Sequence, residues 1–174
     1  MGARIIVVAV ILCIAMPGWA ASDRWKIAGV RAGVGDSRNA ASFSQVEAYA
    51  ILSLPWRWQS ESGWVFGSFI GLNAGVLFYQ QDAVIGAIGP GGYIMTPSRR
   101  FVFSAGSSPT FISRSDFGKE DLGGHFQFTS ALCINVNFLE DMTAGHCFQH
   151  MSNAGIYDNN PGIDMHMFGL GYRF

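Results

Sequence analysis

The stretch that decides the fold is residues 125–138, His-Phe-Gln-Phe-Thr-Ser-Ala-Leu-Cys-Ile-Asn-Val-Asn-Phe. Large apolar residues fall on one parity of this stretch, and mostly polar residues fall on the other. Because successive side chains of a β-strand point to opposite faces, the stretch predicts a strand with one apolar face and one polar face. A strand of a soluble β-sandwich can show the same alternation, so this stretch alone leaves the surroundings of the apolar face open. The apolar parity carries Phe126, Phe128, Leu132, Ile134, Val136 and Phe138.

The same interpretation extends along the chain, where turn-forming residues separate segments with the composition of β-strands. Transmembrane β-barrels of bacteria have an even number of antiparallel strands, and eight is the smallest common number. The sequence therefore predicts an all-β protein, an eight-stranded antiparallel outer-membrane β-barrel. In the second segment Glu47 falls on the inward parity. The predicted segments are 25–34, 43–57, 63–78, 83–95, 100–113, 124–138, 142–152 and 163–174.

Composition agrees with a barrel and excludes other classes. Charged residues make up 13% of the 174 residues, against about 25% in an ordinary soluble domain. After Met16 no apolar run is long enough to span a bilayer as a helix, so the apolar residues must be distributed in alternation. The formal net charge of −1 and the lack of a phosphate-binding loop give no sign of a nucleic-acid partner. The length suits one domain.

The first 20 residues have the pattern of a secretory signal peptide. Arg4 supplies the positive start, 5–16 form an apolar run, and the stretch 17–21 contains small residues that allow cleavage after about residue 20 or 21. A membrane anchor would need about 20 apolar residues, so the run is short for one. Cys13 lacks the small preceding residue that a lipidated cysteine requires, which excludes a lipoprotein. The barrel domain is expected to occupy 21–174.

The C-terminal segment carries the most specific fold signal. Phe168, Leu170, Tyr172 and Phe174 alternate with small or polar residues, and the chain ends on Phe174. This ending resembles the signature that outer-membrane barrels present to the barrel assembly machinery. We therefore expect Phe174 to mediate that interaction, and we expect the protein to lie in the outer membrane of a Gram-negative bacterium, surrounded by outer-membrane lipids.

Two cysteines remain after the signal peptide, Cys133 and Cys147. They lie on facing strands at equal separation from Glu140, both on the inward parity. An oxidising compartment permits a disulfide between them, but directly opposite strand positions often give poor geometry. A disulfide and two small buried thiols both remain open.

A candidate catalytic site lies in the last quarter of the chain. His150 and Ser152 share one face of a predicted strand and sit about 7 Å apart along it. Asp164 begins the next strand after a polar loop, and the alternation places all three on the lipid-facing side. With both termini in the periplasm, the three residues are expected at the outer leaflet. Hydroxyl, imidazole and carboxylate are the groups of a serine hydrolase. The alternative is a polar interfacial belt without chemistry.

The residues around this site resemble the PagL family of outer-membrane lipid A 3-O-deacylases. The resemblance rests on His150-Met151-Ser152-Asn153-Ala154-Gly155, on Asn160-Pro161-Gly162 and on the C-terminal segment, which together cover about the last 30 residues. It implies Ser152 as nucleophile, His150 as general base and Asp164 as the acid. It also implies an oxyanion hole that uses the Asn160 side chain and the Gly155 backbone N–H.

One departure from the family bears on the acid. The family has glutamate where this chain has Asp164, which is one methylene shorter, so contact with the His150 ring is in question. Other candidates are weaker. His146 lies about 20 Å along the strand from Ser152. His166 is a candidate for a replacement base, and Asp158 is a candidate for a substitute acid.

The resemblance implies hydrolysis of the ester-linked acyl chain at position 3 of lipid A, the lipid anchor of lipopolysaccharide, without a cofactor or metal. Two alternatives remain: a non-catalytic barrel of the structural or adhesin type, and an esterase that acts on another lipid such as a phospholipid. The sequence leaves a monomer and a homodimer both open.

Overall fold

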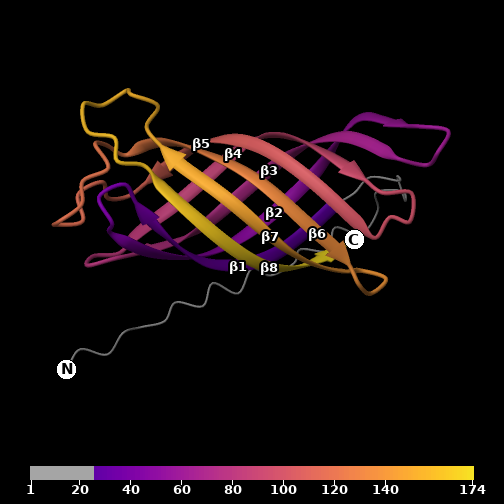
Figure 1. Cartoon of the computed structure of the whole chain (residues 1–174), viewed down its shortest axis with the longest axis horizontal. Coiled ribbons are helices and arrows are strands. Elements are labelled where there is room, and N and C mark those ends of the chain that lie inside the picture. Colours follow the sequence, from indigo (N-terminus) through magenta and orange to yellow (C-terminus); the bar gives the residue numbers. More distant parts are fainter. Residues whose placement is uncertain (1–25) are drawn as a thin grey trace.

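A computed structural model describes residues 26–174, which form a closed antiparallel barrel of eight strands (Figure 1). Each strand pairs with the next along the chain, and the first pairs with the last. The all-β, eight-stranded prediction is therefore confirmed, while the predicted signal peptide at 1–20 lies outside the described residues. Within 26–174 no helix is long and apolar enough to cross a membrane. The strands are β1 (Lys26–Ser37), β2 (Ser42–Gln59), β3 (Val65–Phe78), β4 (Ala83–Met95), β5 (Phe101–Ile112), β6 (Phe126–Asn137), β7 (Met142–Ser152) and β8 (Ile163–Arg173).

The first strand differs most from its predicted bounds. It was expected to end at residue 34, but β1 continues through Asp36, which pairs with Asp164 of β8 and with Ser42 of β2. Gly35 permits this continuation because a Cβ atom there would overlap the Asp164 carbonyl oxygen. Gly35 therefore lets β8 approach β1 closely, and it does not end the strand.

The outer surface of the barrel is apolar, whereas the interior holds buried polar side chains as well as apolar ones. Leu132, Phe168 and Leu170 are 64%, 66% and 52% exposed, whereas Gln127 and Thr129 of β6 are buried inside. This inversion of the soluble pattern is what the alternation predicted, and it suits a barrel surrounded by lipid.

The interior holds a polar layer between two apolar clusters. Arg31 and Glu47 form an ion pair there, and Glu47 is 3% exposed, as its inward parity predicted. Arg31 Nη2 donates to Asn73 Oδ1 at 3.1 Å, and Gln45 Nε2 donates to Glu47 Oε2 at 2.8 Å. Arg31 and Asn73 also line a cavity of about 60 Å³. Since each buried charge has partners, the layer avoids the large penalty of an isolated buried ion.

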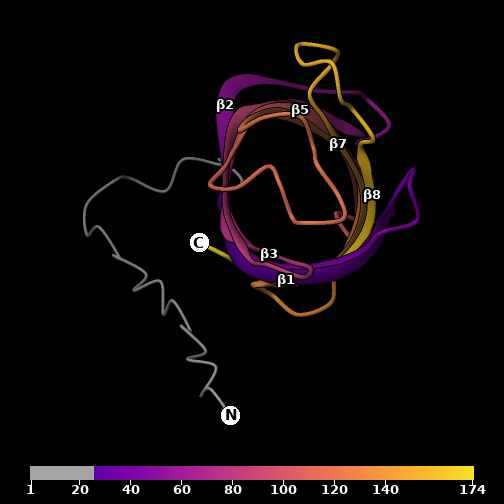
Figure 2. The ribbon, with the colours of Figure 1, turned by 90° about the vertical axis from the view of Figure 1, so that its left-hand side faces the viewer.

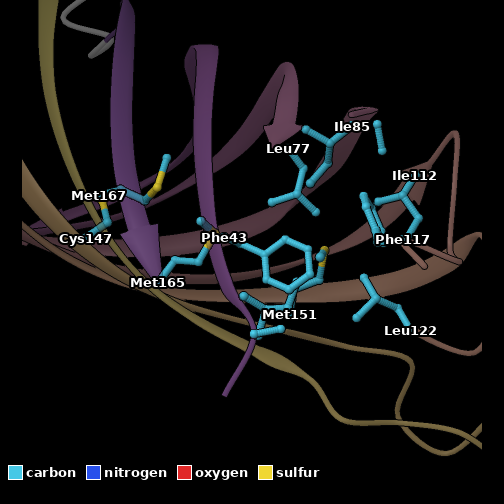
Figure 3. Close-up of a cluster of buried hydrophobic side chains, with 13 residues drawn as sticks. Phe43, Leu77, Ile85, Ile112, Phe117, Leu122, Cys147, Met151, Met165 and Met167 are labelled. Atoms are coloured by element: carbon cyan, nitrogen blue, oxygen red, sulfur yellow. The ribbon is translucent and has the colours of Figure 1, made fainter. Parts of the chain in front are cut away.

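The loop between β5 and β6 closes the end of the barrel where the β7–β8 loop lies. Figure 2 shows this loop crossing the ring of strands. Phe117 and Leu122 from the loop are buried, and Phe117 packs edge-on against Phe43 with ring centroids 5.4 Å apart. Figure 3 shows both side chains within the larger apolar cluster, close to Met151 of β7. The loop is therefore part of the folded core.

Cys133 and Cys147 are directly paired on β6 and β7 and are joined by a disulfide. Of the two states that the sequence leaves open, the structure has the bonded one. The bridge lies on the inward face of the hairpin, because Cys147 belongs to the interior cluster.

Candidate active site

Strands β7 and β8 place His150 and Asp164 directly opposite each other on the outward face of the barrel. His150 Nδ1 lies 2.6 Å from Asp164 Oδ1, with side-chain exposures of 39% and 57%. The contact uses Nδ1, so Nε2 remains the nitrogen that can act on a hydroxyl. An imidazole held by a carboxylate in this way has a fixed orientation and tautomer.

The contact answers the question raised by the shorter acid. Asp164 reaches the ring because it stands on a strand position paired with His150, so the side chain spans only the gap between neighbouring strands. A longer side chain is not needed for contact at this spacing.

Ser152 is the last residue of β7 and is half-buried beside this pair. A Cβ atom added to Gly162 would lie 3.2 Å from His150 Cε1 and 3.7 Å from Ser152 Cβ, so both side chains border the same glycine. Within residues 26–174 no hydrogen bond joins Ser152 Oγ to the imidazole. Such contacts are often long in a substrate-free site and tighten when substrate binds.

The β7–β8 loop brings Asn160 beside the end of β7. Asn160 Oδ1 accepts a hydrogen bond from the Asn153 backbone N–H at 3.1 Å, which leaves Nδ2 as the donor end of the carboxamide. The other expected donor behaves differently: the Gly155 N–H donates to Asn153 Oδ1 at 2.9 Å. Gly155 is exposed and has a φ of 80°, so its place in the loop is that of a turn residue.

The weaker candidates lie elsewhere or have other partners. His166 Nδ1 lies 3.1 Å from His146 Nε2, and the two rings stack with centroids 5.3 Å apart. This pair stands on the outward face beside Phe148 and Phe168. Asp158 lies exposed in the loop, and the carboxylate that contacts His150 among residues 26–174 is that of Asp164.

Two residues near the site, Asp36 and Asn153, were not predicted from the sequence. Asp36 stands opposite Asp164, but β1 was expected to end before it. Asn153 is 0% exposed and hydrogen-bonds to two loops, although a polar residue after a strand normally indicates an exposed turn. A longer β1 would have revealed Asp36 from strand parity, whereas no local signal marks Asn153 as buried. Clusters of three or more His, Cys, Asp or Glu side chains suited to a metal are absent from the described chain.

Fold and site together define the class of protein: a barrel of the transmembrane type whose outward face carries a candidate hydrolase site. Residues 18–173 match the family model described as "Lipid A 3-O-deacylase (PagL)". The chain therefore belongs to the lipid A 3-O-deacylase (PagL) family, as the resemblance implied.

One curated relative is similar in sequence to this chain, and two solved structures are similar to it in fold. The lipid A deacylase PagL of Bordetella bronchiseptica (strain ATCC BAA-588 / NCTC 13252 / RB50) is 32% identical over 75 residues, which cover 43% of this chain and 42% of that protein. The chain thus aligns with less than half of this relative's length. A crystal structure of the outer membrane enzyme PagL is similar in fold, with a TM-score of 0.67 and 16% identity over 86% of this chain and 99% of that one. A de novo designed transmembrane β-barrel shares the fold at a TM-score of 0.52 and 9% identity over 87% of this chain and 95% of the design.

Proposed function

We propose that this protein is an outer-membrane lipid A 3-O-deacylase that uses Ser152, His150 and Asp164 as a catalytic triad. The observation that carries the proposal is the 2.6 Å contact between His150 Nδ1 and Asp164 Oδ1, beside Ser152 on the outward face of a PagL-family barrel. A polar group facing lipid is unfavourable unless it has partners, so three such groups together at one strand end need a reason. Ester hydrolysis supplies that reason.

The reaction follows from the positions of the groups. Ser152 Oγ attacks the carbonyl carbon of the acyl ester at position 3 of lipid A, while His150 Nε2 takes the hydroxyl proton and Asp164 stabilises the imidazolium. Asn160 Nδ2 donates to the oxyanion of the tetrahedral intermediate. The intermediate collapses, and His150 returns the proton to the departing sugar oxygen. Water then attacks the acyl-enzyme by the same route, which releases the fatty acid and restores Ser152.

The depth of the site fits a substrate in the outer leaflet. Ser152 ends β7 and Asp164 follows the first residue of β8, so the triad lies at one end of the barrel and faces outward. The start of β1 and the end of β8 lie at the opposite end, because the eight strands alternate in direction. With the termini in the periplasm, the triad meets the leaflet that contains lipopolysaccharide. We propose that Phe174, which is 64% exposed beside β1, presents the C-terminal signal to the barrel assembly machinery.

Mass spectrometry of lipid A tests the proposal. Purified mature protein in detergent is incubated with lipid A that carries its 3-linked acyl chain and, separately, with phospholipid, alongside the Ser152→Ala variant. We expect loss of one acyl chain from position 3 with the wild-type protein and no change with the variant. Release of acyl chains from phospholipid but not from lipid A would favour the other esterase. A wild-type protein that leaves both lipids intact would favour the non-catalytic barrel.

A further inference from the structure

Asn153 makes more hydrogen bonds than its position in a loop suggests, although the proposed reaction gives it no role. Its backbone N–H donates to Asn160 Oδ1 and its carbonyl accepts from Ile156. Its side chain makes three further hydrogen bonds, so the residue makes five in all. Full burial makes each of these bonds important, because a buried polar group without a partner is strongly unfavourable.

The side-chain bonds of Asn153 join two loops that are far apart in sequence. Nδ2 donates to the Leu122 carbonyl at 3.1 Å and to the Asn159 carbonyl at 2.7 Å, while Oδ1 accepts from the Gly155 N–H at 2.9 Å. Leu122 belongs to the β5–β6 loop that closes the barrel, and Asn159 precedes Asn160. These three hydrogen bonds require a short side chain with two N–H donors and one oxygen acceptor, and among side chains of this length only asparagine has them.

The neighbouring residues strengthen this junction. Asn159 Nδ2 donates to the Asp121 carbonyl at 2.6 Å. A Cβ atom at Gly123 would overlap the Asn159 carbonyl oxygen and lie 2.8 Å from Asn153 Nδ2, and one at Gly124 would overlap the Tyr157 ring. Residues 121–124 are therefore packed directly against the β7–β8 loop.

We propose that Asn153 is a positioning residue, which holds the Asn160 carboxamide in place for the oxyanion. Through Asn153, residues 121–124 of the β5–β6 loop also hold the β7–β8 loop in position. This inference rests on the proposed function. The bond from the Asn153 N–H fixes which end of the Asn160 carboxamide faces the reaction, and the loop junction fixes the backbone on both sides. Displacement of a catalytic group by about 1 Å can lower the rate up to about a hundredfold.

The test compares kcat and KM for lipid A deacylation in four single variants and one double variant. Asn153→Asp keeps the size of the side chain but replaces both donors by an acceptor, so it opposes the carbonyls of Leu122 and Asn159. We expect kcat to fall at least about tenfold with little change in KM, and Asn160→Ala to lower kcat by about a hundredfold. In the double variant Asn153→Asp/Asn160→Ala we expect no further loss, because Asn153 acts through Asn160.

Two glycines of the β5–β6 loop provide a matched pair. Gly123 and Gly118 both have positive φ, at 84° and 89°, so alanine strains the backbone similarly at each. A Cβ atom at Gly118 would contact only the end of the Gln80 side chain. Gly123→Ala should therefore lower kcat, whereas Gly118→Ala should keep it.

Three results would overturn the inference: full kcat in Asn153→Asp, losses that multiply in the double variant, or equal losses in the two glycine variants. Heat-modifiable gel migration confirms that each variant is folded before it is assayed. Failure of the proposed function is seen separately, as a wild-type protein that releases no acyl chain, and it would overturn this inference as well.

Discussion

Asp36 and Asp164 lie directly opposite each other on β1 and β8, so two carboxylates stand side by side at the end of the barrel that carries the site. Their partners differ. Asp36 Oδ1 accepts from Ser42 Oγ at 2.6 Å, whereas Asp164 Oδ1 contacts His150 Nδ1 at 2.6 Å. Of these two acids, Asp164 is therefore the one placed to orient the imidazole.

The two aspartates should respond differently to loss of charge. Asp164→Asn should lower kcat by about a thousandfold or more, because the imidazole loses the partner that fixes its tautomer and stabilises its cation. Asp36→Asn should change kcat by less than about tenfold, since it removes only a nearby charge in a solvated setting. Deacylation kinetics with lipid A measure both. Equal losses in the two variants would mean that the carboxylates act as a unit.

Restoring the glutamate of the family should bring no gain. Asp164 already contacts the ring, so Asp164→Glu must fit an additional methylene between paired strands. We expect activity equal to or below that of the wild type under identical detergent conditions. A clear increase in kcat would show that the aspartate contact is too weak to orient His150.

The disulfide should affect stability without affecting chemistry. Replacing Cys133 and Cys147 together by alanine removes a link across 14 residues, and a loop of this size contributes about 3 kcal/mol in soluble proteins. The bridge faces the interior, whereas His150 faces outward. The double variant should therefore unfold at a lower temperature on heat-modifiability gels and keep its kcat. A parallel loss of activity at low temperature would contradict this separation.

The interior ion pair should be sensitive to removal of one partner. Glu47→Gln leaves the Arg31 guanidinium, only 11% exposed, without its carboxylate inside the barrel. Breaking a buried pair in this way costs about 3–5 kcal/mol, whereas replacing both partners by apolar residues is often neutral. Urea unfolding in lipid vesicles should show a large loss for Glu47→Gln and a small one for Arg31→Met/Glu47→Leu. Similar losses in both variants would contradict the pairing argument.

Cysteine labelling on intact cells tests the orientation of the barrel. Ile156 is 55% exposed in the β7–β8 loop, which makes it a better probe position than Tyr157, whose ring packs against Gly124. A membrane-impermeant maleimide should modify Ile156→Cys and not Glu140→Cys, which lies in the β6–β7 turn at the other end. Cys133 and Cys147 are bonded to each other, so the mature protein without an added cysteine provides the unlabelled background. Labelling of residue 140 alone would place the site at the periplasmic leaflet.

Alternation along the chain was enough to predict the strands and the outward face of the three residues of the proposed triad. His150 and Asp164 needed only strand parity and a short loop between them, because neighbouring antiparallel strands bring such residues together. The position of Asn153 was beyond this reasoning, since its partner Leu122 lies 31 residues away in another loop. The predicted end of β1 at residue 34 was wrong because the strand continues through Gly35, which admits a close neighbouring strand. Contacts between loops form only when the whole barrel closes, so a local sequence pattern does not predict them.

Under the proposed mechanism, the pairing of His150 with Asp164 makes enzymatic activity a measure of correct strand register. A slip of β8 by one residue against β7 would turn Asp164 toward the interior and bring Ile163 or Met165 to the imidazole. Such a barrel would still be rich in β-structure, yet under the proposed mechanism it would lack the carboxylate that orients His150. Under the proposed mechanism, deacylation would therefore distinguish the native register from a slipped one that circular dichroism counts as folded, and it would offer a direct assay for any factor that inserts this chain into a membrane.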